Sequence, residues 1–134
     1  KTISEGAGAA GLAAVLEYPD KFKSEKVGLI LCGGNIDSRM LSSVLMRDMV
    51  RKGQVVTLSI TIPDKPGQLQ TVSGICANAG ANVLAVEHGR FALDLAASSA
   101  RLDITIETRD HDHATEIIQI IRSAGYLATI LESD

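Results

Sequence analysis

Apolar and polar residues alternate from Val56 to Ile62, where every second residue is Val, Leu or Ile and each residue between is Thr or Ser. A period of two is typical of a strand that buries one face. Further along, apolar residues recur at spacings of three and four, at Ala114, Ile117, Ile118 and Ile121. That spacing predicts a helix with one buried stripe. The chain therefore combines strands and helices, as in a mixed α/β fold of the α+β kind.

Breaks in these patterns divide the C-terminal part into six elements. Pro66 suits the first position of a helix, Asp110 precedes a helical stretch as a cap, and Gly80 and Gly125 follow helical stretches. The predicted elements are a strand over about 54–62, a helix over 66–79, strands over 82–90 and 101–108, a helix over 111–124 and a strand over 126–132. The order βαββαβ predicts a ferredoxin-like antiparallel sheet with both helices on one face.

The N-terminal part follows a different pattern. Residues 6–17 are mostly Ala and Gly, which predicts a helix of small residues packed closely against other structure and ended by Pro19. The apolar run 27–31 predicts a short buried strand. Residues 37–52 predict an amphipathic helix that ends at Gly53. This part is therefore expected to be a helix-strand-helix piece.

The composition changes near Gly53, so we divide the chain into residues 1–53 and 54–134. The first part carries a net charge of +2 and the second a net charge of −5, within a total of −3 over 134 residues. A net-negative domain repels phosphate, which argues against nucleic acid as a partner. No apolar run reaches the ~18 residues of a membrane span. The chain begins at Lys1 in the middle of a pattern, which suggests a piece of a longer protein.

Cysteine and histidine give little sign of metal chemistry. Cys32 and Cys76 lack both the density of a disulfide scaffold and the spacing of a zinc site, so we expect reduced thiols in a cytoplasmic protein. His111 and His113 stand two residues apart at a predicted helix start, where two side chains do not face each other. We expect a solvated first turn there and no metal site.

The segment after the first strand carries groups that suit a free amino acid. The first turn of the following helix offers unpaired N–H groups and the positive end of the helix dipole, where a carboxylate binds. Gly67 leaves room for it, Asp64 suits an ammonium group, and Asn82 both accepts and donates hydrogen bonds. The candidate effector-binding residues are Asp64, Lys65, Pro66, Gly67, Gln68, Leu69, Asn82 and Val83.

Each of these residues also has a purely structural explanation. Asp64 suits a helix cap, and Pro66 with Gly67 suits a turn. Asn82 follows Gly80 closely and tolerates a left-handed backbone. It is the combination of these residues on a βαββαβ pattern that favours a binding site.

This part of the chain resembles the ACT domain, a small regulatory module of enzymes of amino-acid metabolism. The resemblance rests on two segments, Asp64-Lys-Pro-Gly-Gln-Leu69 after the first strand and Gly80-Ala-Asn-Val83 after the helix. The resemblance covers about residues 54–134. It implies that two copies pair side by side as a homodimer and join their sheets. It also implies that an amino-acid effector binds in each of the two grooves between the partners.

Two segments of the N-terminal part resemble the end of the catalytic domain of fold-type II pyridoxal-phosphate enzymes, above all threonine ammonia-lyases (threonine dehydratases). They are residues 4–11 (Ser-Glu-Gly-Ala-Gly-Ala-Ala-Gly) and 29–37 (Leu-Ile-Leu-Cys-Gly-Gly-Asn-Ile-Asp). The resemblance implies cofactor-binding roles for Cys32, Gly33, Gly34 and Glu5, with the Cys32 thiol at the pyridine nitrogen. A neutral group there leaves the nitrogen unprotonated, which favours β-elimination of a hydroxyl group over transamination.

Two parts that this enzyme family needs are absent from the sequence. The Schiff-base lysine and the glycine-rich phosphate site of the family lie upstream of the region that this chain resembles. We therefore expect pyridoxal phosphate in the full-length parent, none bound to this chain alone, and no catalytic activity of the chain by itself.

The resemblance implies a parent that converts threonine to 2-oxobutanoate and ammonia, with an ACT domain that senses isoleucine, and valine as its antagonist. The expected partners are a second copy, such an amino acid, and the rest of the catalytic domain. Two alternatives stay open. In the first, the domain is a dimerisation module without a ligand. In the second, it is the regulatory domain of another amino-acid enzyme, and the segment Cys32–Asn35 argues against this second alternative.

Overall fold

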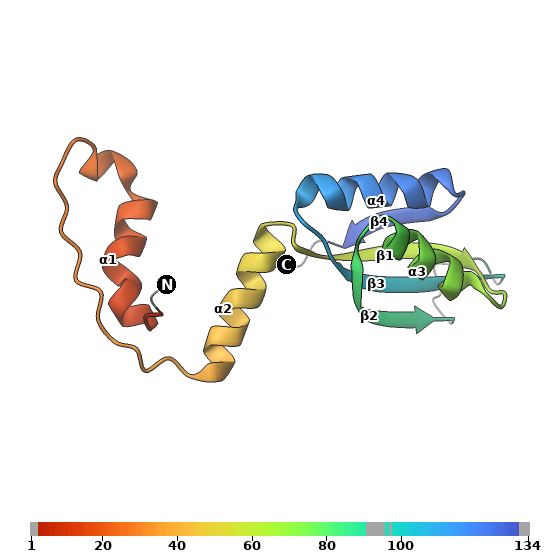
Figure 1. Ribbon diagram of the computed structural model, residues 1–134, viewed down its shortest axis with the longest axis horizontal. Helices are drawn as coiled ribbons and strands as arrows, with labels where there is room; N and C mark the ends of the chain where they lie inside the picture. The colour runs from red at the N-terminus through yellow and green to blue at the C-terminus, as the bar shows by residue number, and fades with distance from the viewer. Residues whose placement is uncertain (1–2, 91–95, 97, 132–134) are drawn as a thin grey trace. The chain divides into compact units, whose positions relative to one another are not determined.

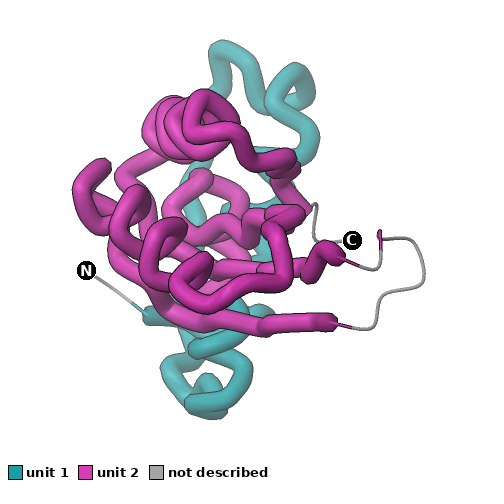
Figure 2. The backbone as a smooth tube through the Cα atoms, turned by 90° about the vertical axis from the view of Figure 1, so that its right-hand side faces the viewer, with its two compact units in different colours: residues 1–45 teal, residues 46–134 magenta. Residues whose placement is uncertain are grey.

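The computed structural model describes residues 3–90, 96 and 98–131. The chain forms two compact units, Lys1–Leu45 and Met46–Asp134 (Figure 2). The division falls inside a helix, α2 (Ser38–Arg51), although the composition changes later, at Gly53. The end of α2 belongs with unit 2 because it is hydrogen-bonded to that unit, as described below.

Unit 2 holds a four-stranded antiparallel sheet with strand order β2-β3-β1-β4, and its helices α3 and α4 cover one face (Figure 1). Its elements are β1 (Val55–Pro63), α3 (Gln68–Asn78), β2 (Asn82–Gly89), β3 (Ser99–Glu107), α4 (His111–Ser123) and β4 (Leu127–Leu131). The predicted ferredoxin-like βαββαβ fold is confirmed. Residue 132, the predicted end of the last strand, lies outside the described residues.

The core forms on the helix-covered face, as the period of two predicts. The even-numbered residues of β1 and β3 face the aliphatic side chains of both helices there, and all of them are buried except Val56, which is partly buried. The most deeply buried members are Leu58, Ile60, Ile62, Val72, Cys76, Leu102, Ile104, Ile106, Ile117 and Ile121. The other face is polar, and Thr57 and Thr105 pair across it through a hydroxyl hydrogen bond of 2.9 Å.

Three helices end in the same way. After α2, α3 and α4, a glycine with positive φ follows the cap residue: Gly53 (66°), Gly80 (83°) and Gly125 (92°). In each case the glycine N–H and the next N–H turn back to carbonyl groups of the last helical turn, as Gly53 does to Val50 and Gln54 to Met49. This is the Schellman motif, which satisfies carbonyls that the helix leaves unpaired. The predicted helix ends are therefore confirmed.

His113 ties the start of α4 to the end of α3. Its side chain is buried, its Nδ1 accepts a hydrogen bond from the Arg109 N–H, and its Nε2 donates to the Ala79 carbonyl at 2.8 Å. Because a backbone N–H can only donate and a carbonyl can only accept, these contacts select the neutral Nε2–H tautomer. The predicted solvated first turn is therefore wrong for His113.

The start of α3 differs from the prediction. The helix begins at Gln68, so Pro66 is not its first residue but part of the turn before it. Gly67 is the cap residue and has a left-handed φ of +88°. That backbone conformation interrupts a right-handed helix, and it is the reason that the helix starts two residues late.

Unit 1 contains α1 (Gly6–Glu17), which confirms the predicted helix over 6–17 that ends before Pro19. A 3₁₀ turn that was not predicted, η1 (Pro19–Phe22), follows it. The predicted strand at 27–31 is wrong, because this segment has no regular structure and Ile30 is 86% exposed. A strand needs a neighbouring strand for its N–H and C=O groups. Unit 1 supplies none among its described residues.

Unit 1 also lacks an apolar core. Among residues 3–45, Gly8 alone is buried, and every buried apolar side chain in the described chain belongs to unit 2. An isolated helix of about 12 residues is marginal in water. Among its described residues, unit 1 therefore supplies little packing to stabilise α1.

We predict that amide hydrogen exchange separates the two units. In the isolated chain, amides of α1 should exchange at nearly the rate of an unfolded peptide, because little buried surface protects them. Amides of β1 and β3 should be protected to the level of global unfolding, and they serve as the internal control. Equal protection in α1 and β3, measured by mass spectrometry, would contradict the prediction.

Candidate functional site

The β1–α3 turn, residues 64–67, is fixed at both ends and open at its tip. The Asp64 N–H donates to the Ser98 carbonyl at 2.9 Å, and the Lys65 N–H donates to Pro63 at 2.8 Å. At Gly67 a Cβ atom would meet nothing within 4 Å. The sheet therefore sets the position of the turn, while the space beside Gly67 stays accessible.

The first amides of α3, next to Gly67, have no acceptor among the described residues. The first helical bond runs from the Thr71 N–H to the Gly67 carbonyl at 3.1 Å. Within the described part of the chain, the N–H groups of Gln68, Leu69 and Gln70 donate to no acceptor, and no side chain caps the helix. Unpaired amides and the helix dipole together attract a carboxylate or another anion.

Asp64 pairs with Arg90, a residue that the sequence analysis did not select. Arg90 Nε lies 3.4 Å from Asp64 Oδ1, and the side chains are 60% and 39% exposed respectively. An exposed pair of this kind contributes about 0–1 kcal/mol. The Asp64 carboxylate, predicted to take an ammonium group, is thus next to a guanidinium group. No local pattern around Arg90 signalled this contact, because it joins two loops far apart in sequence.

The other residues predicted in this segment have mixed roles. Lys65 and Pro66 are exposed, and Leu69 is 42% exposed beside the open amides. Gln68 accepts a hydrogen bond of 3.0 Å from the Tyr126 hydroxyl, which ties the start of α3 to the segment before β4. The sequence analysis missed Tyr126 as well, although a tyrosine beside an edge strand does need a partner for its hydroxyl.

Asn82 and Val83 do not meet the β1–α3 turn within one chain. Asn82 pairs with Glu107, which also pairs with Val55 at the start of β1, whereas Asp64 follows the end of β1. One chain by itself therefore does not bring Asp64 and Asn82 together, and the predicted groove between two subunits stays a prediction. Helix α3 carries the chain back along the sheet, so the two groups stand about 25 Å apart at ~3.3 Å per strand residue.

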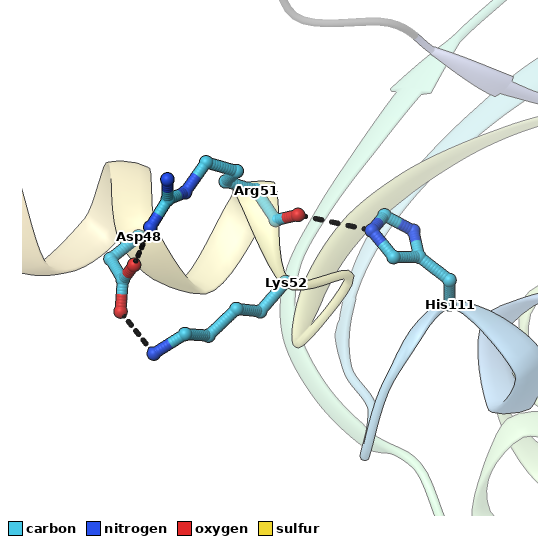
Figure 3. Close-up of polar contacts among 4 residues, drawn as sticks. All are labelled: Asp48, Arg51, Lys52 and His111. Atoms are coloured by element: carbon cyan, nitrogen blue, oxygen red, sulfur yellow. Dashed lines mark hydrogen bonds and ion pairs between the residues drawn. The ribbon is translucent and has the colours of Figure 1, made fainter. Parts of the chain in front are cut away.

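A hydrogen-bonded joint fixes the end of α2 to the sheet domain (Figure 3). His111 Nε2 donates to the Arg51 carbonyl at 3.0 Å, so His111 is engaged and not simply solvated as predicted. Thr108 donates through its hydroxyl to the Gly53 carbonyl and through its N–H to Gln54. We call these residues, Arg51–Gln54 with Thr108 and His111, the α2 joint.

The last turn of α2 is braced by charges as well. Lys52 and Arg51 both contact Asp48, at 2.5 and 2.8 Å (Figure 3). Hydrogen bonds from Lys52 and then Arg51 hold the pKa of the Asp48 carboxyl below its usual value. Because these groups are exposed, and the His111 bond is exposed as well, the α2 joint depends chiefly on the buried hydrogen bond from Thr108 to Gly53.

In unit 1 the two predicted cofactor motifs do come together. The Glu5 N–H donates to the Gly33 carbonyl at 2.8 Å, and the Ser4 hydroxyl donates to the Cys32 carbonyl at 2.8 Å. Gly33 has a φ of +74°, and a Cβ atom there would lie 2.3 Å from Glu5 Oε1. At Gly8 a Cβ atom would lie 1.5 Å from the Cys32 carbonyl oxygen. The contact between the motifs therefore requires glycine at position 8, where a Cβ atom would meet backbone, and the positive φ favours glycine at position 33.

This contact borders a hollow of about 220 Å³, smaller than the roughly 300–1,000 Å³ of a complete small-molecule site. Its lining residues are Ile3, Ser4, Leu31, Cys32, Gly33 and Gly34. The Cys32 thiol is free and exposed, whereas Cys76 is buried, and burial raises the pKa of its thiol. The residues present thus suit one wall of a cofactor site, with Cys32 as its polar group.

In the part of the chain that the structure describes, no group of three His, Cys, Asp or Glu side chains is arranged to hold a metal ion. None of the helices in that part of the chain has the length and apolar character needed to cross a membrane.

Comparison with known proteins gives consistent matches. A family model for the ACT domain matches residues 56–126, more than half of the chain. An L-threonine ammonia-lyase of Thermotoga maritima is 38% identical over 131 residues, which are 98% of this chain and 32% of that protein. An L-threonine ammonia-lyase of Geobacter sulfurreducens is 35% identical over 132 residues, 98% of this chain and 33% of that protein. The chain thus spans about a third of the length of these curated relatives.

Among solved structures, a prephenate dehydratase from Streptococcus mutans has a TM-score of 0.47 and 22% identity, and the match covers 57% of this chain and 40% of that chain.

We predict that Gly53→Ala lowers the free energy of unfolding more than Gly80→Ala does, because Gly53 lies in the α2 joint. Both Gly80→Ala and Gly53→Ala force alanine to positive φ, which costs about 1–2 kcal/mol. At Gly53 a Cβ atom would also lie 2.6 Å from the ring and backbone of His111, whereas Gly80 has open space. We expect Gly53→Ala to lower the free energy of unfolding by at least about 1 kcal/mol more, as overpacking does. Equal losses in urea denaturation would refute a tightly packed joint.

Proposed function

This chain belongs to the ACT domain family, and from that premise we propose that residues 54–134 bind a free amino acid and so regulate a longer enzyme. The observation that carries this proposal is the set of open amides at the start of α3. An amino acid is a zwitterion, and its carboxylate suits the N–H groups of Gln68, Leu69 and Gln70. The Asp64 carboxylate, at the same end of the sheet, suits its ammonium group.

A second copy supplies the part of the site that one chain does not assemble. Strand β2 lies at an edge of the sheet, and two such edges can pair antiparallel about a two-fold axis. That pairing sets the start of one β2 beside the end of the other. Asn82 of the partner subunit then stands at the sheet end that holds Asp64, with Val83 beside it. Pairing through β4, the opposite edge, would leave Asn82 remote from that end.

We infer that the longer enzyme is a threonine ammonia-lyase, which converts threonine to 2-oxobutanoate and ammonia. The two relatives with that name align with 98% of this chain, including residues 1–53. In this proposal residues 1–53 are the end of the catalytic domain and residues 54–134 are the regulatory domain. The effector is then an end product of the pathway, isoleucine, with valine as its antagonist.

The wall formed by Glu5 and Cys32–Gly34 supports a role in holding pyridoxal phosphate in that parent. When bound, the cofactor supplies the electron sink for elimination of the threonine hydroxyl group. Cys32 offers the pyridine nitrogen a neutral thiol, a weaker donor than a hydroxyl. Gly34 leaves open space on its side of the turn, while Gly33 receives Glu5. Since the lysine of the family lies outside this sequence, the chain alone is proposed to be inactive.

The α2 joint gives the sensing domain a route to the catalytic domain. Because Thr108 and His111 bond to the end of α2, a change in the position of α4 moves α2 with it. An effector shifts activity this way only if it binds one dimer arrangement more tightly than the other. The exposed apolar residues of α2, Met40, Val44 and Leu45, suit burial against the rest of the catalytic domain.

The second candidate is an ACT domain that dimerises without a ligand. In this alternative two copies pair through the β2 edge in the same way, and the open amides of α3 have no role. A regulatory domain of a different amino-acid enzyme is less well supported, because it leaves the paired motifs at Glu5 and Cys32 without a role.

Calorimetry with isoleucine, valine, threonine and serine tests the sensing proposal. We expect isoleucine or valine to bind with a dissociation constant at or below about 1 mM, which corresponds to roughly 4 kcal/mol. Asn82→Ala should weaken that binding, and Gln119→Ala, on the exposed side of α4, should not. No heat from any of the four amino acids at millimolar concentration would leave the dimerisation module as the function.

Sedimentation tests which edge forms the dimer. At tens of micromolar the chain should sediment as a dimer. Val86→Lys, near the middle of β2, should dissociate it because two ammonium groups then face each other near the two-fold axis. Leu127→Lys, on the exposed edge strand β4, is the matched control and should remain dimeric. A monomeric wild-type chain, or dissociation by the β4 variant alone, would contradict the arrangement.

A further inference from the structure

The ion pair of Asp64 and Arg90 has a function that no local motif assigns to it. Resting on the proposed function, we propose that Arg90 is a specificity-determining residue, and that the effector inserts between the two side chains. The ammonium group of the amino acid forms an ion pair with Asp64. Its carboxylate contacts Arg90 and accepts hydrogen bonds from the open amides of α3. In the free protein the guanidinium group occupies the place of the ligand ammonium.

The position of Arg90 supports this role. Asp64 follows the end of β1, Arg90 follows the end of β2, and the start of β3 lies between these two strands. The Arg90 side chain therefore reaches across the start of β3 to contact Asp64 at 3.4 Å. This is also the end of the sheet at which α3 begins, so the three partners of a zwitterion come from three separate elements.

The weakness of the pair is what makes insertion possible. Both side chains are substantially exposed, and Nε of Arg90 approaches a single carboxylate oxygen at a long distance. Breaking such a contact costs little, because water already solvates both groups. A ligand that carries both charges replaces one weak contact by two charge-assisted ones.

The arrangement also predicts which ligands are rejected. A 2-oxo acid keeps the carboxylate but has no ammonium group, so it displaces Arg90 and leaves Asp64 unpaired. An alkyl amine displaces Arg90 from Asp64 but has no carboxylate, so the guanidinium group and the open amides of α3 are left without an anionic partner. Only a zwitterion restores a partner to every charge, and the site is therefore expected to select free α-amino acids by their two ends.

Other exposed ion pairs in the described chain lack this setting. Arg51 and Lys52 pair with Asp48 inside one helix. Arg109 lies 3.8 Å from Glu116 at the start of α4, at the opposite end of the sheet. Arg109→Gln thus removes a similar exposed contact by the same chemical change, far from the open amides, and serves as a matched control for Arg90→Gln.

The test is calorimetry of the dimeric chain with isoleucine as the probe. We expect Arg90→Gln to weaken binding about tenfold or more, Arg90→Lys to weaken it less, and Arg109→Gln to leave it unchanged. Urea denaturation and sedimentation of each variant establish that it folds and pairs. Unchanged binding in a folded Arg90→Gln variant would overturn the role of Arg90 while leaving the sensing function intact.

A second measurement needs no variant. The wild-type chain is titrated with isoleucine, with its 2-oxo acid 3-methyl-2-oxopentanoate, and with 2-methylbutylamine. Binding of isoleucine at least about tenfold tighter than either analogue supports insertion into the pair. Comparable binding of the oxo acid would overturn it. Absence of binding by isoleucine, valine, threonine and serine alike would overturn the proposed function itself, and this inference with it.

Discussion

Burial of one aliphatic face of β1 and β3 under two helices is the interaction on which the rest of the structure depends. The chain has few aromatic residues, so Leu, Ile, Val and Ala side chains supply the buried surface. Alternation along β1 fixes which face is covered, and a slip of one residue in register would expose that face entirely. Because β1 is the central partner of both β3 and β4, its position determines where the β1–α3 turn and the α2 joint lie.

The two ends of β1 thus carry different tasks. At its start, Gly53 and His111 hold α2 against the sheet domain, and at its end the open amides of α3 face solvent. Neither site has a core of its own, and each is kept in shape by the same strand. In this arrangement the proposed ligand site and the end of α2 are joined by β1, a central strand of the buried core.

Local patterns in the sequence predicted most of the fold, and contacts between distant segments account for what they missed. Some features depend only on residues close together in the chain, so the sequence predicts them. They are the period of two, the Asp110 cap and the glycines at helix ends. The segment 27–31 has the composition of a strand, but no strand pairs with it in the part of the chain that the structure describes. The late start of α3 follows from the backbone at Gly67. Arg90, Tyr126 and His111 have roles only through residues far away in the chain, and the separation of Asn82 from Asp64 follows from topology rather than from spacing.

The placement of Asp64 and Asn82 at opposite ends of one sheet has a genetic consequence. If each groove draws Asp64 from one subunit and Asn82 from the other, a chain damaged at either residue forms no intact groove with itself. A mixed dimer of the two damaged chains places both lesions in the same groove and leaves the other groove whole. Two variants that have each lost effector binding would then complement each other, because every mixed dimer keeps one of its two grooves whole. Chains carrying both lesions together would not rescue either one.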